Sequence, residues 1–556
     1  MIPSSISLGE LRQRIDEVVR FLEVTLSIAN AHTVEFYTHD VWSRFVAVSP
    51  EEVLNALGLN GHKGEPEIQN QIGYNEQLKT SFGFCQDTNR LVDAHNMLRS
   101  AKAHSLPGLG VCMSRDELLE ALRQKPTELG AETGVELEPD EFMNTKKSHE
   151  VQSMAEVVDC LAKRCGVKQV IDVGSGKGYL SSFLSLQHDL RVFGIDSSST
   201  NTHGAQERNR KLKKFSKVYQ KHRKAAKGEP DHQLVTEIKA AEDREESQED
   251  KMQLSDPNPT EELFLSAMTL EVLQTGRTSP SSLTDEERQR RKRENLEKKA
   301  QSRTGATGAV FSPLTSYVTA ETELRELISE LEDAVLVGLH TCGDLAPSML
   351  RMFVAKAELL AVCSVGCCYN KLSEEFEADT QERSSGAFGF PLSQHLRRLS
   401  WFCGRNARMS ACLALERVAV GHGIQMDSLF YRAVLHVILR DHYGAYKSEK
   451  RVGNVYAKAK SFVDYVRRAL RKLDLDDSKL SEEDIQQYHD AHAPRWPEIR
   501  AFNLLKVTLA PCIEGLILLD RLCYLKEQNQ GSFSALVQLF DPLLSPRCYA
   551  IVALKD

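Results

Sequence analysis

Short apolar runs alternate with helical stretches through the middle of this 556-residue chain. Five runs have the length and apolar content of buried strands: residues 168–173, 191–196, 314–318, 335–340 and 359–365. Two further strand-like runs occur only near the C-terminal end, at residues 534–540 and 548–554. Strands that alternate with helices are typical of a parallel sheet with helices on its faces. The pattern therefore predicts an α/β protein with a Rossmann-like core.

The chain around this core is mostly helical. Apolar residues recur at helical spacing near the N-terminus, and Ser49-Pro50 has the form of a capped helix start. A mainly helical region also follows strand five, so we expect a long helical insertion between strands five and six. A separate C-terminal helical domain with its own hairpin is the alternative. The expected segments are a helical N-terminal domain at 1–145, core residues at 146–219 and 311–390, an insertion at 220–310, the helical insertion at 391–530 and the final strands at 531–556.

Residues 220–310 interrupt the pattern of the core. They contain one aromatic residue, Phe264, together with an acidic run at 242–250 and mixed charges at 288–299. A segment of this composition buries too little apolar surface to offset the entropy of ordering. We therefore expect most of this insertion to be disordered.

Composition and charge narrow the class of protein. The apolar share of 41% and the charged share of 27% are ordinary for a globular protein. The N-terminus has no basic region followed by an apolar core, and the 13 cysteines are scattered, which favours reduced thiols in the cytoplasm or nucleus. The most apolar stretch, Leu504–Leu525, includes Lys506, Glu514, Asp520 and Arg521. It predicts a buried helix, and we expect no membrane partner.

A glycine-rich loop follows the first predicted strand. Residues 170–178 read Val-Ile-Asp-Val-Gly-Ser-Gly-Lys-Gly, and a predicted helix starts at Tyr179. Glycines let the backbone turn sharply and approach a ligand closely. Asp196 ends the next apolar run and can accept both hydroxyls of a ribose. The expected cofactor-binding residues of this region are Asp172, Gly174, Ser175, Gly176, Gly178 and Asp196.

The spacing of the glycines indicates which cofactor to expect. Dinucleotide sites have Gly-x-Gly-x-x-Gly, whereas this loop has Gly-x-Gly-x-Gly with Asp172 two residues before the first glycine. This form resembles motif I of class I S-adenosylmethionine-dependent methyltransferases. In that family the loop cradles the amino-acid part of the cofactor, and the acid of the second strand holds the ribose. The resemblance implies S-adenosyl-L-methionine as the cofactor.

Reactive side chains follow strands four and five. Strand four leads into His340-Thr341-Cys342-Gly343-Asp344, and strand five leads into Gly366-Cys367-Cys368-Tyr369-Asn370. The carboxyl ends of neighbouring parallel strands meet at one edge of a sheet, where ligands bind. We expect His340 and Cys342 to contact the cofactor as well. The expected catalytic or acceptor-binding residues are His340, Lys147, Cys367, Cys368, Tyr369 and Asn370, with Lys146 and His149 closing the cleft.

Each of these residues also has a plainer interpretation. His340 can be a packed or capping histidine, and the polar groups can simply satisfy the backbone at strand ends. His340, Cys342, Cys367 and Cys368 suggest zinc, but the side chains of adjacent cysteines usually point apart and the chain has no Cys-x-x-Cys pair. We therefore expect no metal ligands.

The combined motifs resemble the methyltransferase-like protein 25 family and its sister, which is named for a ribosomal RNA adenine dimethylase domain. The resemblance covers nearly the whole chain. The matching segments are Lys146–Glu150, Val170–Tyr179, Gly194–Asp196, Ala205–Arg208, Gly338–Leu345 and Val365–Asn370. It implies a methyltransferase and supplies no substrate.

The residues after strand four bear on the methylated atom. Enzymes that methylate adenine N6 carry Asn/Asp-Pro-Pro-Tyr or a close variant there, whereas this chain has His340-Thr341-Cys342-Gly343. N6-adenine methylation is therefore disfavoured. The His-x-Cys-Gly segment and the paired cysteines look more like a related tRNA ribose methylase. Ribose 2′-O-methylation needs a base near the hydroxyl, and His340 or Lys147 can serve.

A strongly basic segment suggests the acceptor. From Arg208 to Lys227, ten of twenty residues are Lys or Arg, which fits a helix that follows RNA phosphates, a nuclear localisation signal or simply a solvated helix. RNA is the leading substrate class, and the net charge of −8 argues against a chain that is basic overall. We do not expect DNA. A protein methyltransferase and a non-catalytic S-adenosylmethionine-binding module stay open as alternatives.

Overall fold

The computed structural model describes residues 6–58, 84, 89–123, 143–209, 311–377, 387–415, 417, 426–444, 452–528 and 533–555. The insertion expected to be disordered, 220–310, lies outside the described residues. So does the basic segment after Asn209.

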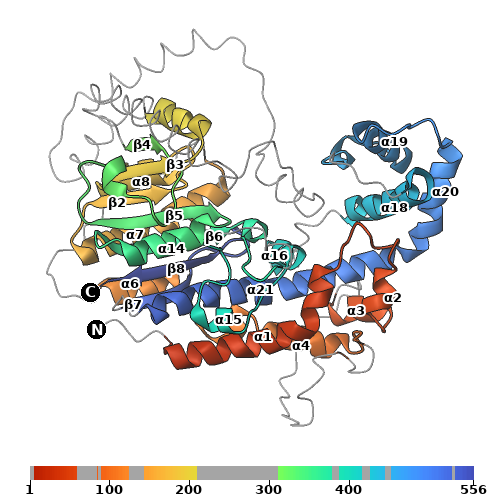
Figure 1. The fold of residues 1–556 in the computed structure, drawn as a ribbon, viewed down its shortest axis with the longest axis horizontal. Helices are drawn as coiled ribbons and strands as arrows, with labels where there is room; N and C mark the ends of the chain where they lie inside the picture. Colours follow the sequence, from red (N-terminus) through yellow and green to blue (C-terminus); the bar gives the residue numbers. More distant parts are fainter. Residues whose placement is uncertain are drawn as a thin grey trace, which may run out of the picture.

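A mixed eight-stranded sheet forms the centre of the protein (Figure 1). Its strands are β1 (Cys112–Ser114), β2 (Gln169–Val173), β3 (Arg191–Asp196), β4 (Ser312–Thr315), β5 (Ala334–Cys342), β6 (Leu359–Cys367), β7 (Phe533–Gln538) and β8 (Tyr549–Leu554). They are arranged in the order β1-β7-β8-β6-β5-β2-β3-β4, and β8 is antiparallel to both neighbours. Without the edge strand β1, the other seven strands can be numbered 1 to 7 in chain order. Followed across the sheet from β4 to β7, they then have the order 3-2-1-4-5-7-6. This is the strand order of a class I methyltransferase. The predicted fold class is confirmed.

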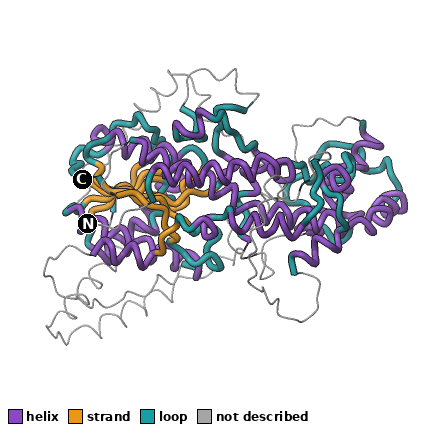
Figure 2. The backbone as a smooth tube through the Cα atoms, turned by 90° about the horizontal axis from the view of Figure 1, so that it is seen from below, coloured by secondary structure: helices purple, strands orange, loops and turns teal. Residues whose placement is uncertain are grey.

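Helices cover both faces of this sheet, as Figure 2 shows with the strands seen edge-on. One face packs against α6 (Arg115–Arg123), α7 (Thr145–Cys165) and α8 (Tyr179–His188). The other packs against α14 (Leu345–Ala355) and α21 (Trp496–Glu527). Neighbouring residues of β2 alternate between the two cores, because side chains of a strand point to opposite faces. The buried strands therefore read as continuous apolar runs.

The helical insertion between strands five and six is confirmed. After β6 the chain forms helices before it returns to the sheet as β7 and β8. These helices are η4 (Tyr369–Lys371), α15 (Gln394–Arg398), α16 (Arg405–Ser410), α18 (Met426–Tyr443), η6 (Tyr456–Lys458), α19 (Phe462–Lys472), α20 (Glu482–His492), η7 (Ala493–Arg495) and α21. β8 pairs with β6 and β7 pairs with β8, as expected for the last two strands.

The N-terminal helices share one apolar core with this insertion. They are α1 (Leu8–Asn30), α2 (Val41–Phe45), α3 (Pro50–Ala56), α4 (Ala94–Ala103) and α5 (Leu106–Leu109). Figure 1 shows α1 running beside α21. Their contact includes an ion pair between Arg12 and Glu527 at 3.1 Å and a hydrogen bond from Lys506 Nζ to the Ala31 carbonyl at 2.8 Å. Within the described chain, the N-terminal helices of residues 1–145 therefore do not have a hydrophobic core of their own.

Helix α21 is the longest apolar element. The continuous helical stretch 482–527 is long and apolar enough to cross a membrane, but 94% of its apolar window is buried inside the protein. Its two buried acidic side chains have partners: Glu514 accepts a hydrogen bond from Tyr369, and Asp520 accepts from the Leu392 and Ser393 backbone amides. These bonds explain how an apolar helix can carry charge in a protein core.

The strand ends differ from the sequence-based expectation. β5 and β6 extend to Cys342 and Cys367, which we placed in loops. β4 covers 312–315, shifted from the expected 314–318, and the short edge strand β1 was not predicted. A strand of three residues is too short to give a periodic hydrophobic pattern in the sequence. β1 forms by pairing in parallel with the edge of β7. The short helix α13 (Leu324–Leu327) connects β4 to β5.

Candidate active site

The glycine loop joins β2 to α8 at the carboxyl edge of the sheet. Gly174, Gly176 and Gly178 all have positive φ, at 75°, 57° and 73°. A Cβ atom on Gly178 would lie 2.1 Å from the ring of Phe311. Only glycine adopts this backbone without strain. The three glycines are therefore required by the turn itself, which is the property expected of a loop that wraps a ligand.

Asp196 ends β3 beside this loop. Its Oδ2 accepts a hydrogen bond from the Gly176 amide at 3.0 Å. Its Oδ1 accepts from the Ser198 amide at 2.8 Å and from Asn201 Nδ2 at 3.1 Å. An ionised carboxylate has about four acceptor sites, so these bonds orient Asp196 and leave it able to accept from a ligand hydroxyl.

Two buried polar atoms, one at the end of β2 and one in the loop, have no hydrogen-bond partner. Asp172 is 1% exposed, and its Oδ2 accepts from Ser181 Oγ at 2.6 Å, while its Oδ1 has no hydrogen bond. Ser175 Oγ is also buried without one. Burial, opposed by the Ser181 bond and reinforced by the charge of Asp196, raises the pKa of Asp172 to about 7. An unsatisfied buried polar atom costs about 1–3 kcal/mol, so this loop fits a ligand that brings polar groups.

Helix α7 brings residues of the Lys146–Glu150 segment to the same edge. Asn144 caps the helix by accepting from the Lys147 amide at 2.8 Å. The helix runs back along the sheet before β2 begins, so its first turn lies at the carboxyl ends of the strands. His149 Nε2 accepts from the Asp541 amide at 3.0 Å and therefore helps to fix the β7–β8 connection.

Glu150, which is buried, pairs with the partly exposed His340 at this edge. Glu150 Oε2 lies 2.9 Å from His340 Nε2, and Oε1 accepts from Ser545 Oγ at 2.6 Å. Lys146 Nζ is 4.0 Å from Oε1. Burial opposes ionisation of Glu150, but the hydrogen bond and charge of His340 leave the pKa of this carboxyl below its ordinary value. The carboxylate thus orients the imidazole and holds a proton on Nε2, which leaves Nδ1 as the nitrogen that can accept a proton.

His340 occupies a bulge in β5. The register between β5 and β6 shifts between Leu339 and Thr341, and His340 has a φ of 62°. A left-handed conformation costs a residue with a Cβ about 1–3 kcal/mol, and such strain concentrates at functional sites. The bulge turns the imidazole toward α7.

Lys147 and Arg208 both contact one aromatic ring. Lys147 Nζ lies 4.2 Å and Arg208 Cζ 4.3 Å from the centroid of Tyr179, the first residue of α8. Burial is the main cause that lowers the pKa of Lys147, and the charges of Lys177, Lys146 and Arg208 act in the same direction. Cations over a ring are stabilised by its quadrupole. The result is a basic cluster next to the glycine loop.

Three cysteines converge between β5 and β6. Cys342 Sγ lies 3.1 Å from Cys367 Sγ and 3.2 Å from Cys368 Sγ, and the last two sulfurs are 3.6 Å apart. Cys368 has a φ of 41°, which turns its side chain toward that of its neighbour. The assumption that adjacent cysteines point apart is therefore wrong here, because it presumes ordinary extended backbone.

Tyr369 and Asn370 are placed differently from the expected cleft. Tyr369 is 1% exposed, and its hydroxyl donates to Glu514 Oε1 at 2.8 Å. It points into the core, away from a solvent-accessible acceptor. Asn370 is half-buried, with its Oδ1 4.0 Å from Cys412 Sγ. The conformation of this loop, rather than its composition, decides that difference.

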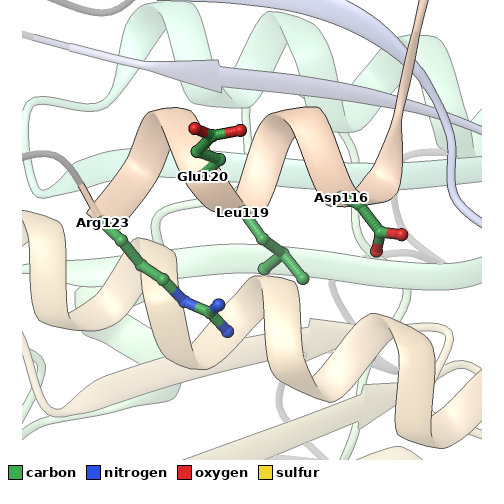
Figure 3. Close-up of a pocket in the computed structure, with 4 residues that line it drawn as sticks. All are labelled: Asp116, Leu119, Glu120 and Arg123. Atoms are coloured by element: carbon green, nitrogen blue, oxygen red, sulfur yellow. The ribbon is translucent and has the colours of Figure 1, made fainter. Parts of the chain in front are cut away.

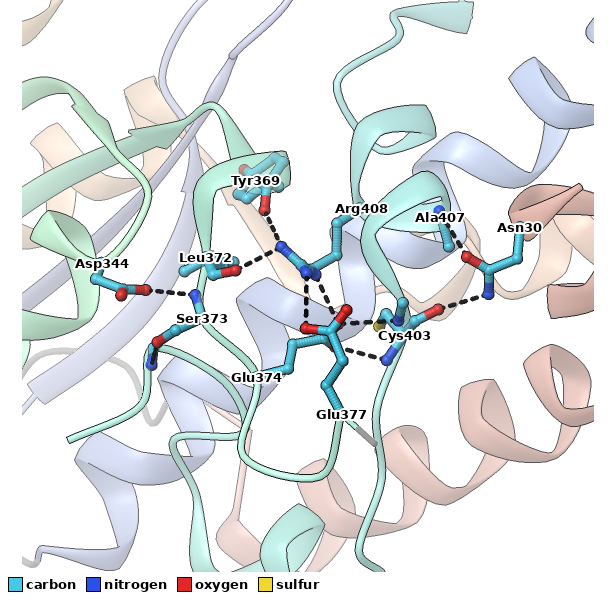
Figure 4. Close-up of polar contacts among 12 residues, drawn as sticks. Asn30, Asp344, Tyr369, Leu372, Ser373, Glu374, Glu377, Cys403, Ala407 and Arg408 are labelled. Carbon is cyan, nitrogen blue, oxygen red and sulfur yellow. Dashed lines mark hydrogen bonds and ion pairs between the residues drawn. The ribbon is translucent and has the colours of Figure 1, made fainter. Parts of the chain in front are cut away.

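A buried ion pair fixes the segment that follows β6 (Figure 4). Arg408 of α16 donates from Nε to Glu374 at 2.7 Å and from a terminal nitrogen to the carbonyls of Tyr369 and Leu372. Glu374 also accepts from the Cys403 amide at 2.7 Å. The insertion thereby holds the loop that carries Cys367 and Cys368.

Sequence reasoning did not assign roles to Ser181, Ser545 or Glu374. Ser181 lies three residues after the last glycine and therefore on the first turn of α8, where it bonds to Asp172. Its spacing from the glycine loop could have predicted this position. Ser545 and Glu374 gave no sequence signal, because their partners are distant along the chain.

A hollow of about 420 Å³ lies elsewhere, along α6 (Figure 3). Asp116, Leu119, Glu120 and Arg123 line it, and none of them belongs to the glycine loop or the cysteine group. Residues 124–142, which continue from Arg123, lie outside the described chain. We assign no role to this hollow.

Comparisons with known proteins agree with this geometry. A family model described as "Methyltransferase domain" matches residues 146–375, which span the glycine loop through the cysteines. The chain is 46% identical to "Probable methyltransferase-like protein 25" of Mus musculus and 44% identical to the protein of that name of Homo sapiens. Each match covers 100% of this chain and 98% of the relative. No solved structure matches.

The strand order, the glycine loop and the matched domain define a methyltransferase. Such a domain implies a methyl donor, and the loop has the polar, glycine-rich form that a donor site requires. The full-length identity is decisive for the family: this chain belongs to the methyltransferase-like protein 25 family, as the sequence motifs indicated.

Proposed function

We propose that this methyltransferase takes its methyl group from S-adenosyl-L-methionine and transfers it to RNA. The donor part rests on Asp172, Ser175 and Asp196. Buried oxygens of the first two lack partners, and Asp196 is oriented beside the glycine amides. S-adenosylmethionine, when bound, supplies an electrophilic methyl group. Its amino-acid part brings an ammonium group and its ribose two hydroxyls, which are the donors that these oxygens need.

The basic cluster around Tyr179 supports RNA as the acceptor. Lys147 and Arg208 contact the same ring next to the glycine loop. Cations beside an aromatic face are the groups that bind phosphates and stacked bases in single strands. Arg208 also begins the segment in which ten of twenty residues are basic, most of which lies outside the described chain. This cluster is the observation that carries the proposal.

The Glu150–His340 pair supplies the proton acceptor. Methylation of a ribose hydroxyl removes its proton as the oxygen attacks, and a positioned histidine can take that proton at Nδ1. Glu150 stabilises the imidazolium that results, through its 2.9 Å contact with Nε2. Among residues expected to be catalytic, His340 fits this role best, because Lys147 is engaged with Tyr179.

Replacing Asp196 with Ala tests donor binding. A hydrogen bond from a ribose hydroxyl to a charged carboxylate contributes about 1.5–3 kcal/mol. The affinity for S-adenosylmethionine should therefore fall at least about tenfold when this carboxylate is removed. Isothermal titration calorimetry measures the change. Asp333→Ala is the matched control, since Asp333 is exposed just before β5, at the opposite end of that strand. Equal affinity in wild type and Asp196→Ala would contradict the assigned site.

The acceptor class is tested on cellular products. Methylated nucleosides and methylated peptides are compared by mass spectrometry between cells with and without the gene. Loss of one ribose-methylated nucleoside, restored by the wild-type chain and not by His340→Ala, supports RNA. Loss of a methylated peptide with an unchanged nucleoside profile assigns a protein substrate and refutes the RNA proposal.

A further inference from the structure

The three converging cysteines form a group that the proposed methyl transfer does not use. Their ligand atoms lie within 4.8 Å of one another. Over the described residues, no other set of three histidine, cysteine or acidic side chains meets this closely. We propose that Cys342, Cys367 and Cys368 bind one zinc ion.

The backbone is built to bring these sulfurs together. Cys342 and Cys367 are register partners at the ends of β5 and β6, so their side chains share one face of the sheet. That register exists only because of the bulge at His340. The left-handed conformation of Cys368 adds the third sulfur to the same face. Two unfavourable backbone conformations thus serve one cluster.

The two strand ends also touch directly. A Cβ atom on Gly343 would lie 2.8 Å from the Lys371 carbonyl oxygen, so no side chain separates the loops. Cys367 Sγ is 3.2 Å from the His340 carbonyl. The two loops therefore pack against each other, which keeps the backbone of the three cysteines close while their side chains can still rotate.

The spacing fits a zinc ion bound by thiolates. Zinc–sulfur bonds of about 2.3 Å in tetrahedral geometry place sulfurs about 3.8 Å apart. The observed 3.1–3.6 Å is slightly shorter, and small side-chain rotations can open it around an ion. Soft thiolates select thiophilic metals such as zinc over magnesium or calcium.

The charge of the site can be balanced. On binding, three thiols release three protons to solvent, and three thiolates with one Zn²⁺ carry a net charge of −1. Lys371 packs against Gly343, the residue that follows Cys342, which places its positive charge next to the group. It offsets the remaining negative charge.

The zinc ion would keep one position open. In the described chain no fourth ligand-type side chain belongs to the group, and Cys342 is exposed. Three protein ligands and an open position are typical of zinc that binds water or a substrate group. The proposed site lies at the carboxyl ends of β5 and β6, the edge that also carries His340.

Metal content of the full chain tests the proposal independently of methyl transfer. The protein is purified with a non-thiol reductant, loaded with zinc sulfate, dialysed, and analysed by inductively coupled plasma mass spectrometry. Wild type should retain one zinc per chain, and Cys342→Ser and Cys368→Ser should each lose most of it. Cys165→Ser, at the end of α7 and outside the group, should retain it. Gel filtration and circular dichroism check the folding of each variant.

Cobalt provides a readout that needs no variant. Co²⁺ bound by thiolates in a tetrahedral site gives sulfur-to-metal charge-transfer and intense d–d absorption, and zinc should abolish both. Absence of these bands together with no retained zinc in wild type would overturn the proposal. Retention of zinc by both cysteine variants would also overturn it. A disulfide between two of the three cysteines that persists in protein purified with the reductant, found by peptide mass spectrometry, would overturn the zinc site and assign a redox pair instead.

Discussion

At the scale of single residues, Asp172 shows how a loop can be prepared for a ligand. The carboxyl group is buried beneath the glycine loop, bonded on one oxygen and unpaired on the other. Burial favours its neutral form, and its pKa is raised to about 7. A positively charged donor placed beside it would reverse this preference. The residue thus links the protonation of this carboxyl to the binding of a ligand by the loop.

Replacing Asp172 with Asn should change how stability depends on pH. The carboxyl has a pKa of 3.8 when unfolded and about 7 when folded, so its contribution is most favourable below pH 3.8 and is lost as pH rises through about 7. The loss is on the order of 4 kcal/mol, from about 1.4 kcal/mol per pKa unit. Asn does not ionise, so the free energy of unfolding of Asp172→Asn should rise relative to wild type between pH 5 and pH 8.

Urea unfolding of the cofactor-free protein at both pH values measures this change. A constant difference between variant and wild type across that range would show that Asp172 does not titrate there.

At the scale of elements, helix α16 holds the end of β6. Arg408 is 2% and Glu374 0% exposed, and both also bond to backbone groups of the joined segments. Removing one partner of a buried pair leaves an uncompensated charge. The loop that carries the cysteines depends on this pair for its position.

Arg408→Met should therefore destabilise the protein by about 3–5 kcal/mol, because the Glu374 carboxylate would stay buried without the cation that balances its charge. Chemical unfolding measures the loss. Arg468→Met is the matched control: its 2.8 Å pair with Asp464 is partly exposed and spans one turn of α19, so about 0.3–0.5 kcal/mol is expected. Similar losses in the two variants would refute the importance of the buried pair.

At the scale of the whole molecule, the N-terminal helices and the insertion form one body around α21. Leu22 of α1 is 0% exposed within the core that also contains Leu505, Leu509 and Leu516. Elements that bury a common surface unfold together. The N-terminal region should thus stabilise the helix that supports the last two strands.

Leu22→Ala should lower stability by about 2–5 kcal/mol and raise hydrogen exchange in α21, far away in sequence. Exchange followed by mass spectrometry over residues 496–527 detects this effect. Glu23→Ala, which changes the exposed neighbour, should leave the exchange of α21 unaltered. Faster exchange confined to α1 would indicate a separate N-terminal domain.

The sequence by itself determined the core of this methyltransferase. Local patterns were sufficient there: apolar runs marked the buried strands, glycine spacing marked the loop, and Asp196 followed at a fixed distance. The late pair of strands showed that the helices between are an insertion. These signals survive in the sequence because backbone sterics and burial act on neighbouring residues.

Only the tertiary structure decided which reactive groups meet. Glu150 reaches His340 across 190 positions, and Ser545 reaches Glu150 across 395. The bulge at His340 and the left-handed Cys368 bring the sulfurs together, while the same turn sends Tyr369 into the core. One-residue register shifts reverse which face a side chain takes, and no local pattern encodes them.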